Sequence, residues 1–401
     1  MYKWPLSVSS FSLWDKFQVA WFILTSDRYT MGEKVKELEW KLRQKACYNE
    51  NKFPYCLLTS SGSGAISLLF DTWKQINKKK FNSTVVIVPA VTWSTSASIP
   101  LLAGYEVKFC DINLNDLSFD YDKLEKIIKQ ETTKGHHVIL WPTCLLGFVP
   151  NIPRLKFLAR EYGCDLWMDC AEATQSQHDE GSILSCCDNT ITSMYFSHNF
   201  QSGGELGALF TKSEEFYEIA SCVRCHGQTK VLDPTYSQLR KNLEKKNPTI
   251  DKRFLFGFLG NNYRPMEISA LFTLLDLKRW NEYAVKRVNL YNLFYDRWQG
   301  LGSLNFNKID LPQGTIPFAI PIFLKPWQDL NKTKEYCESL GVETRSLVAG
   351  DLLRQPAFRH LGNYRSFPNA EVAHSRIFYI GLHPKLKEEQ VTKLAEKLNG
   401  L

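Results

Sequence analysis

The 401-residue chain has no apolar run approaching the ~20 residues that a bilayer-spanning helix requires. Near its N-terminus it also lacks a basic region followed by an apolar stretch and a small-residue cleavage site. The segment from Trp14 to Leu24 is interrupted by Asp15, Lys16 and Gln18. We therefore expect neither insertion into a membrane nor secretion.

The eleven cysteines do not form a known framework, because their number is odd and no paired CxxC motifs occur. The closest spacings are Cys186-Cys187 and Cys222-x-x-Cys225, and there is no C-x-C pair. Reduced thiols in a cytoplasmic protein without a metal site are the simpler interpretation.

The charge of the chain is also modest. The net charge is +7 and the pI is near 8.7, with lysine and arginine scattered apart from short runs such as Lys78 to Lys80. Such runs are usually solvated, so we expect no nucleic-acid interface.

With 44% hydrophobic residues, the chain can bury a large core and divide into two domains. Short β-rich runs alternate with helical patterns, which predicts an α/β fold with a mostly parallel sheet covered on both faces. The expected strands are 85–88, 107–110, 138–141, 166–168, 190–195 and 208–210, and helices are expected at 124–130 and 152–162.

A single long helix from residue 266 to 298 is expected to lead into a smaller C-terminal α+β domain. The predicted division is 1–275 for the large domain and 276–401 for the small one. Ligand-binding residues should lie at strand ends, in the crevice between the domains.

A lysine-free segment carries the most information about function. From Ser193 to Thr211 the chain reads SMYFSHNFQSGGELGALFT, which is a strand, a glycine-rich turn and a second strand. Five further stretches accompany it: SSGSGAISLLF (60–70), PAVTWSTSAS (89–98), LWMDCAEATQ (166–175), GNNYRPMEISA (260–270) and GVETRSLVAGDLLRQPAF (341–358).

Together these stretches resemble the motifs of the DegT/DnrJ/StrS family, sugar-nucleotide enzymes that use pyridoxal phosphate (PLP) on the aspartate-aminotransferase fold, type I. In most members of that family, the loop that corresponds to this segment holds the lysine that binds the cofactor. Counted from Ser193, the lysine position holds His198, whereas counting backward from Glu205 places Asn199 there. The approach SMYFSH favours His198, which resembles a branch of 3-dehydratases acting on NDP-4-keto-6-deoxyhexoses.

Two features have chemical meaning without the resemblance. The turn Gly62-Ser63-Gly64 opens a helix whose free amides can hold a phosphate, to which Ser193 could add a hydroxyl. Asp169 follows an apolar run, which places a carboxylate at the end of a buried strand. A plain turn for the first and a helix N-cap for the second remain open.

The resemblance implies further cofactor contacts. Asp169 would keep the pyridine nitrogen protonated, and Trp93 would stack on the ring. Glu172 would lie near the phenolic oxygen, although relatives often have Gln, His or Asp there. Asn262 would reach the cofactor phosphate of a neighbouring subunit, which implies a homodimer.

Two residues, His226 and Arg345, resemble positions near the substrate in relatives. Because histidine cannot bind the cofactor covalently, the resemblance implies pyridoxamine phosphate (PMP) as the working form. His198 would take a proton from the cofactor and deliver it to the departing C3 hydroxyl. L-Glutamate would then restore PMP, since the missing C-x-C pair disfavours the iron–sulfur route.

The implied product is a 3,6-dideoxysugar precursor for an O-antigen or other surface glycan. Two other functions remain open: a sugar-nucleotide aminotransferase served by another lysine, such as Lys212, and a noncatalytic protein that binds sugar nucleotides.

Overall fold

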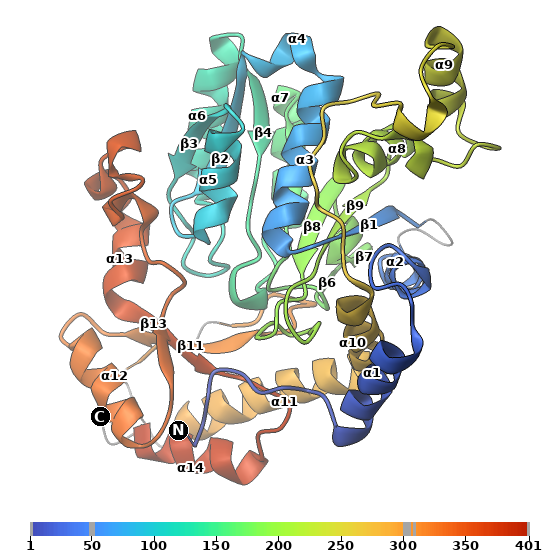
Figure 1. Ribbon diagram of the computed structural model, residues 1–401. Coiled ribbons are helices and arrows are strands. Elements are labelled where there is room, and N and C mark those ends of the chain that lie inside the picture. Colours follow the sequence, from blue (N-terminus) through green and yellow to red (C-terminus); the bar gives the residue numbers. More distant parts are fainter. Residues whose placement is uncertain (1–2, 48–52, 300–305, 308–309, 399–401) are drawn as a thin grey trace.

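The computed structural model describes residues 3–47, 53–299, 306–307 and 310–398. Two sheets organise the chain, a large one in the N-terminal part and a smaller one near the C-terminus (Figure 1). No helix in the described ranges is long and apolar enough to cross a membrane.

The large sheet has seven strands. In spatial order they are β1 (Tyr55–Thr59), β9 (Gly207–Thr211), β8 (Asn189–Ser193), β5 (Asp165–Asp169), β4 (His137–Leu140), β2 (Thr84–Pro89) and β3 (Glu106–Cys110). The strands from β8 to β3 pair in parallel, and β9 runs antiparallel to both of its neighbours. The predicted mostly parallel sheet is confirmed.

Both faces of this sheet are covered, and the strand β2 shows how. Val86 and Val88 pack into the core shared with α3 (Gly62–Ile76), α5 (Ser94–Leu102) and α8 (Glu214–Arg224). Val85 and Ile87 point the other way, into the core shared with α2 (Glu33–Lys45), α6 (Tyr121–Thr133) and α7 (Ile152–Tyr162). Because successive strand side chains alternate between faces, a strand buried on both sides is a continuous apolar run.

The C-terminal part is an antiparallel sheet with helices, as expected. Its strands follow the order β10 (Phe306–Asn307), β11 (Ala319–Leu324), β13 (Ile377–Gly381) and β12 (Thr344–Ser346). The helices of this part are α11 (Trp280–Gln299), α12 (Leu330–Ser339), α13 (Pro368–Arg376) and α14 (Glu388–Leu398). Figure 1 shows it beneath the large sheet, with α11 and α14 along its outer side.

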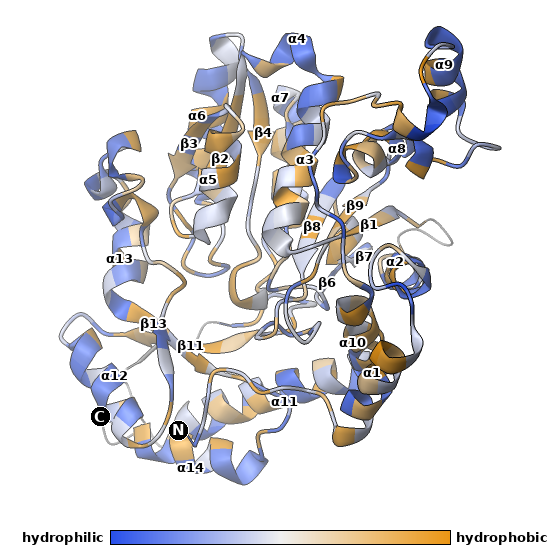
Figure 2. Cartoon of the chain, in the orientation of Figure 1, coloured by the Kyte–Doolittle hydropathy of each residue, from blue (hydrophilic) through white to orange (hydrophobic). Residues whose placement is uncertain are grey.

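The remaining elements are α1 (Leu13–Thr25), α4 (Lys78–Phe81), α9 (Gln238–Lys246), α10 (Glu267–Leu277) and the short pair β6 (Gln177–His178) and β7 (Gly181–Ser182). α1 carries much apolar surface on the outside of the molecule (Figure 2).

Three expectations differ from the structure. The strand expected at 190–195 ends at Ser193, where the lysine-free loop begins, and β1 was not predicted. The single helix expected from 266 to 298 was wrong: α10 ends at Leu277 and α11 begins at Trp280. The break coincides with contacts of Asp276 and Arg279 to other parts of the chain. The boundary predicted between residues 275 and 276 falls inside α10 and stays a prediction.

Candidate active site

The N-terminus of α3 lies against the ends of β8 and β9. A Cβ atom added to Gly62 would come within 2.6 Å of the Ser193 Cβ, and one added to Gly207 would come within 2.2 Å of the Ser61 carbonyl oxygen. The Ser61 hydroxyl caps α3 by accepting the Gly64 amide at 3.0 Å. Only glycine fits at Gly62 and Gly207, because the neighbouring backbone and side chains already fill the space.

This packing produces a cradle for an anion. The Gly62 and Ser63 amides belong to the first turn of α3, where no intrahelical acceptor is available. The positive end of the helix dipole favours negative charge there. The Ser193 hydroxyl lies beside Gly62 and adds a donor. The predicted phosphate residues Gly62, Ser63 and Ser193 are therefore together.

The carboxylate of Asp169 lies at the end of β5 and is only 2% exposed. It accepts the Ser96 hydroxyl at 2.8 Å and the Ala171 amide at 3.0 Å. Burial raises the pKa of Asp169, and both hydrogen bonds lower it. Among the described residues no cationic side chain pairs with this carboxylate, which suits a cationic ligand group such as a protonated ring nitrogen.

The side chain of Glu172 lies one turn further on and accepts the Leu146 amide at 2.6 Å. Leu146 adopts a left-handed conformation with φ 51°, and its carbonyl oxygen accepts the Phe318 amide at 2.9 Å. Burial raises the pKa of Glu172 to about 7; the Leu146 bond opposes this, and the nearby Asp169 charge adds to it. Glu172 thus connects the end of β5 with the C-terminal domain.

The imidazole of His198 is half-buried in the loop between β8 and β9, and its Nδ1 lies 3.1 Å from the Ser193 carbonyl oxygen. That contact requires a proton on Nδ1 and leaves Nε2 as the acceptor. In the described part of the chain, Nε2 has no hydrogen-bond partner. Burial lowers the pKa of His198 to about 4, and the Ser193 bond opposes this. The ring is therefore neutral at pH 7 and can accept a proton.

Aromatic rings border this imidazole. The rings of Tyr195 and Phe318 each lie 5.8 Å from it between centroids, in edge-to-face geometry. Tyr379 continues the wall at 6.2 Å from Phe318. The neighbouring Asn199 is instead buried, with its amide nitrogen 3.3 Å from the Ile316 carbonyl oxygen.

Arg345 lies in β12 directly across from Tyr379 in β13. Its guanidinium is exposed and lies 3.3 Å from a Glu343 carboxylate oxygen. Burial raises the pKa of the Tyr379 phenol, Glu172 raises it further and Arg345 lowers it. Arg345 and Tyr379 are therefore paired across neighbouring strands of the C-terminal domain, and the Glu172 charge is close enough to raise the pKa of Tyr379.

Trp93 precedes α5 just beyond the end of β2, and its indole is 58% exposed. Such a large exposed aromatic face would gain free energy by stacking on a ligand. Its neighbour Thr92 is buried and fixed by a 2.8 Å hydroxyl contact with Thr143.

The structure does not bring His226 and Asn262 into this group. Both are exposed beside α8, where Cys225 and Asn262 form an antiparallel bridge. The His226 amide donates to the Asn261 carbonyl oxygen at 2.9 Å, and φ of His226 is 63°. In the described ranges no hydrogen bond or ring contact joins either residue to His198.

Sequence reasoning missed Ser96, Leu146, Phe318 and Tyr379. Ser96 could have been found, because it lies three residues after Trp93 within the stretch 89–98 that carries the resemblance. Leu146 reaches the site through its bond to Glu172, and Phe318 and Tyr379 come from the C-terminal domain. A single sequence carries no local signal for such contacts between distant segments.

Comparison with known proteins identifies the family. The sequence model of the DegT/DnrJ/EryC1/StrS aminotransferase family matches residues 15–399. The chain belongs to this family. The family recognised in the sequence and the aspartate-aminotransferase fold of type I are both confirmed.

Two full-length relatives share one name, GDP-4-keto-6-deoxy-D-mannose 3-dehydratase. The Escherichia coli O55:H7 protein is 26% identical over 415 residues, covering 99% of this chain and 100% of that protein. The Yersinia pseudotuberculosis protein is 27% identical over 406 residues, covering 98% of each. The lipopolysaccharide biosynthesis protein RfbH of Salmonella typhimurium is 26% identical over 362 residues, covering 86% of this chain and 80% of that protein.

Solved structures agree on the fold. The E. coli GDP-4-keto-6-deoxy-D-mannose 3-dehydratase with bound hydrated PLP matches with a TM-score of 0.86 at 22% identity, over 99% of both chains. A putative sugar aminotransferase from Streptococcus pneumoniae matches with a TM-score of 0.81 at 20% identity, over 99% of this chain and 96% of that one.

Proposed function

We propose that this protein is a PMP/PLP-dependent 3-dehydratase that removes the C3 hydroxyl of an NDP-4-keto-6-deoxyhexose. The observation that carries this proposal is the position of the His198 imidazole in the lysine-free loop, bonded to Ser193 beside the anion cradle of Ser193 and Gly62. The two full-length relatives named as 3-dehydratases support it, and their names favour a GDP-sugar as substrate.

The residues of the site fit the cofactor. The Gly62 and Ser63 amides and the Ser193 hydroxyl would hold its phosphate, Trp93 would cover one ring face, and the unpaired carboxylate of Asp169 would hold the proton of the ring nitrogen. When bound, PMP supplies an amine that condenses with a ketone and a ring that withdraws electrons.

His198 would move the proton. Its Nδ1 is fixed by the Ser193 carbonyl oxygen, so Nε2 is the atom that takes a proton and then returns it to the leaving hydroxyl. The Phe318 ring beside it reduces access for water. Asn199 is a weaker candidate, because its side chain is buried and bonded to Ile316.

Glu172 would contact the cofactor's phenolic oxygen, and Arg345 would bind the sugar nucleotide or the amino donor. Glu172, with a pKa raised to about 7, can share a proton with the cofactor's phenolic oxygen near neutral pH. Arg345 offers an exposed guanidinium to the phosphates of the sugar nucleotide or to a carboxylate of L-glutamate, the proposed amino donor.

An aminotransferase served by Lys212 is disfavoured by the strand register. Ser193 pairs with Gly207 and Asn189 pairs with Thr211, so Lys212 follows the far end of β9. Five strand residues span roughly 15 Å, which separates Lys212 from the anion cradle.

We infer that the enzyme is a homodimer. α1 exposes several large apolar side chains, with Leu13 at 84%, Trp14 at 66%, Trp21 at 61% and Leu24 at 80% exposed. A second copy would cover this surface. The same association would allow the exposed Asn262 and His226 to serve the site of the neighbouring subunit. Size-exclusion chromatography with light scattering tests this, and a monomer at micromolar concentration would contradict it.

The cellular role follows the same resemblance. The eleven cysteines are free thiols, which fits the reducing cytoplasm. RfbH is named as a lipopolysaccharide biosynthesis protein, so a 3,6-dideoxysugar for an O-antigen is the proposed end product.

The decisive experiment incubates the purified protein with PLP, L-glutamate and GDP-, CDP- or dTDP-4-keto-6-deoxyhexoses and determines the product by mass spectrometry. A 4-keto sugar lacking one oxygen supports the 3-dehydratase, whereas a 4-amino sugar would overturn it.

The variant His198→Asn should abolish dehydration, since general acid–base catalysis contributes about 10²–10⁴-fold. His360→Asn is the matched control, because His360 is exposed in the C-terminal domain and should keep wild-type turnover. Near-normal turnover by His198→Asn would contradict the role of this residue.

A further inference from the structure

The loop that carries His198 is closed at its base by backbone hydrogen bonds. The Met194 amide donates to Leu206 at 2.8 Å, and the Ser202 amide donates back to Met194 at 2.9 Å. The Phe196 amide donates to Gly204 at 2.9 Å. The tip of the loop lies beyond these bonds. There the His198 amide donates to the Tyr195 carbonyl oxygen at 2.9 Å, and side chains anchor the residues that follow.

Gln201 is the most thoroughly bonded of these side chains, and it is only 4% exposed. Its Oε1 accepts the amide and the hydroxyl of Ser10 at 3.0 and 3.1 Å, and its Nε2 donates to the Val8 carbonyl oxygen at 3.0 Å. The Gln201 amide donates to Asp276 at 3.0 Å. One residue of the loop is thus joined to the N-terminal segment and to the end of α10.

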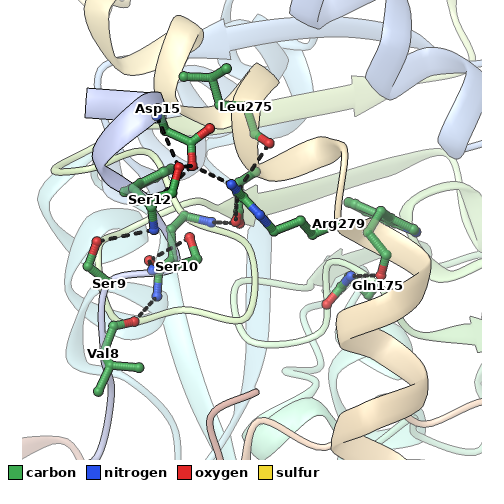
Figure 3. A network of polar contacts seen from close by, with 12 residues as sticks. Val8, Ser9, Ser10, Ser12, Asp15, Gln175, Leu275 and Arg279 are labelled. Atoms are coloured by element: carbon green, nitrogen blue, oxygen red, sulfur yellow. Dashed lines mark hydrogen bonds and ion pairs between the residues drawn. The ribbon is translucent and has the colours of Figure 1, made fainter. Parts of the chain in front are cut away.

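Figure 3 shows Ser10, a partner of Gln201, in one network of polar contacts with Ser12, Asp15 and Arg279. Arg279 pairs with Asp15 and lies 3.8 Å from Asp276. Asp15 also accepts the Ser12 amide at 2.7 Å in the capping box of α1. The network therefore extends from the start of α1 through the α10–α11 junction to the loop.

Neighbouring residues hold the loop from two further directions. Phe200 is 1% exposed, and its ring lies 4.9 Å from Trp280 in edge-to-face geometry. Asn199 donates to Ile316 in the C-terminal domain. These contacts and Gln201 leave the tip of the loop little freedom to move.

We propose that Gln201 is a positioning residue that holds the imidazole of His198 at the site by tying its loop to the N-terminal segment and to Asp276. This inference rests on the proposed function. A lysine in this loop would be fixed by its covalent bond to the cofactor, whereas a histidine depends on the contacts of its own loop. Misplacement of a catalytic group by about 1 Å costs on the order of 10²-fold in rate.

Gln201→Met tests this, because methionine keeps the length of the side chain and removes its three hydrogen bonds. We expect kcat for C3 dehydration to fall about 10- to 100-fold with KM changed less than about threefold. The matched control is Gln355→Met, which removes a 3.1 Å side-chain bond to the Ala349 carbonyl oxygen away from the loop and should leave kcat unchanged.

A second measurement needs no cofactor and no turnover. Diethyl pyrocarbonate modifies accessible neutral histidines, and peptide mass spectrometry gives the rate at each one. In cofactor-free Gln201→Met, modification of His198 should rise about fivefold as the loop opens locally, while the exposed His360 keeps its rate. If Gln201→Met does not fold, Ser10→Ala removes one bond from the same side chain and should show a smaller rise of about twofold.

Unchanged kcat together with unchanged protection of His198 would overturn the inference. A wild-type protein without dehydratase activity would instead contradict the proposed function, and the modification rates would still decide the role of Gln201.

Discussion

The two halves of the candidate site differ in how completely the contacts within a single chain fix the positions of their residues. On the large domain, Gly62, Ser193 and Asp169 are buried, and neighbouring atoms of the same chain fix their positions. Arg345 is exposed, and its guanidinium bonds to the nearby Glu343. Asn262, which a single chain does not bring to this group, is also exposed and bonds to Arg264. The first half is built before any ligand arrives, and the second half offers groups that a ligand or a second copy would engage.

The comparison separates two kinds of evidence for function. A buried carboxylate without a cationic partner, such as Asp169, costs stability unless something binds it, so it points to a ligand by itself. An exposed arginine or asparagine does not lower the stability of the protein, so it indicates a functional role only when the family resemblance also points to it. Substitutions in the two halves should therefore differ in size and in kind.

Among substitutions in the two halves, the largest effect is expected for Asp169→Asn, which removes the charge that would hold the ring-nitrogen proton. We expect kcat to fall about 10²–10³-fold, because charge stabilisation in a buried site is worth several kcal/mol. Steady-state kinetics and the absorption spectrum of bound PLP measure it. Asp165→Asn at the opposite end of β5 is the control, since Asp165 only bonds to Trp73 and His137. Equal losses in both variants would mean that Asp169 acts through folding.

Gly62→Ala should have the next largest effect, because the new methyl group would lie 2.6 Å from the Ser193 Cβ. Overpacking of this kind costs about 3 kcal/mol or less, and it should weaken PLP binding about tenfold or more by displacing the amides of the cradle. Chemical unfolding and PLP titration test both parts.

Gly204→Ala is its control, since a Cβ at Gly204 has no atom within 4 Å. If Gly62→Ala binds PLP as tightly as Gly204→Ala, the cradle does not hold the cofactor.

The sequence was most informative where local chemistry and topology coincide. The helix predicted after the turn at Gly62 and the buried strand predicted before Asp169 are both present, and both residues lie at strand ends. Their roles in binding a ligand stay predictions.

The features that could not be predicted depend on contacts between distant segments. Phe318 reaches His198, and Tyr379 reaches Phe318, because the C-terminal domain packs below the large sheet. The break between α10 and α11 was missed because apolar residues continue at helical spacing on both sides of it, at Leu274, Leu277 and Trp280. It coincides with the bonds of Asp276 to Gln201 and of Arg279 to Asp15.

Glu172 lies between the two halves, and its effect should depend on pH. Its folded pKa of about 7 is above the ordinary carboxyl value, so its favourable contribution to stability is present at low pH and is lost as the pH rises from about 4.5 through 7. Relative to Glu172→Gln, the wild type should therefore lose about 1–2 kcal/mol of unfolding free energy between pH 5 and pH 7.5.

Urea unfolding of both proteins at the two pH values measures this difference. His198 is present in both proteins, so its own contribution to the pH dependence of stability cancels. A difference that does not change with pH would mean that Glu172 is ionised throughout this range.

The smallest effect on the protein itself is expected for Arg345→Gln in the exposed half. The guanidinium is 62% exposed and its pair with Glu343 is 3.3 Å long, so the free energy of unfolding should change by less than about 1 kcal/mol. If Arg345 contacts the sugar nucleotide, KM should nevertheless rise about tenfold with kcat nearly unchanged, because a charge-assisted contact to phosphate is lost equally from substrate and transition state.

Arg359→Gln, at another exposed arginine of the C-terminal domain, should leave KM unaltered. If KM and stability both stay at wild-type values in Arg345→Gln, the substrate lies elsewhere, and the exposed half of the site must be sought on the neighbouring subunit.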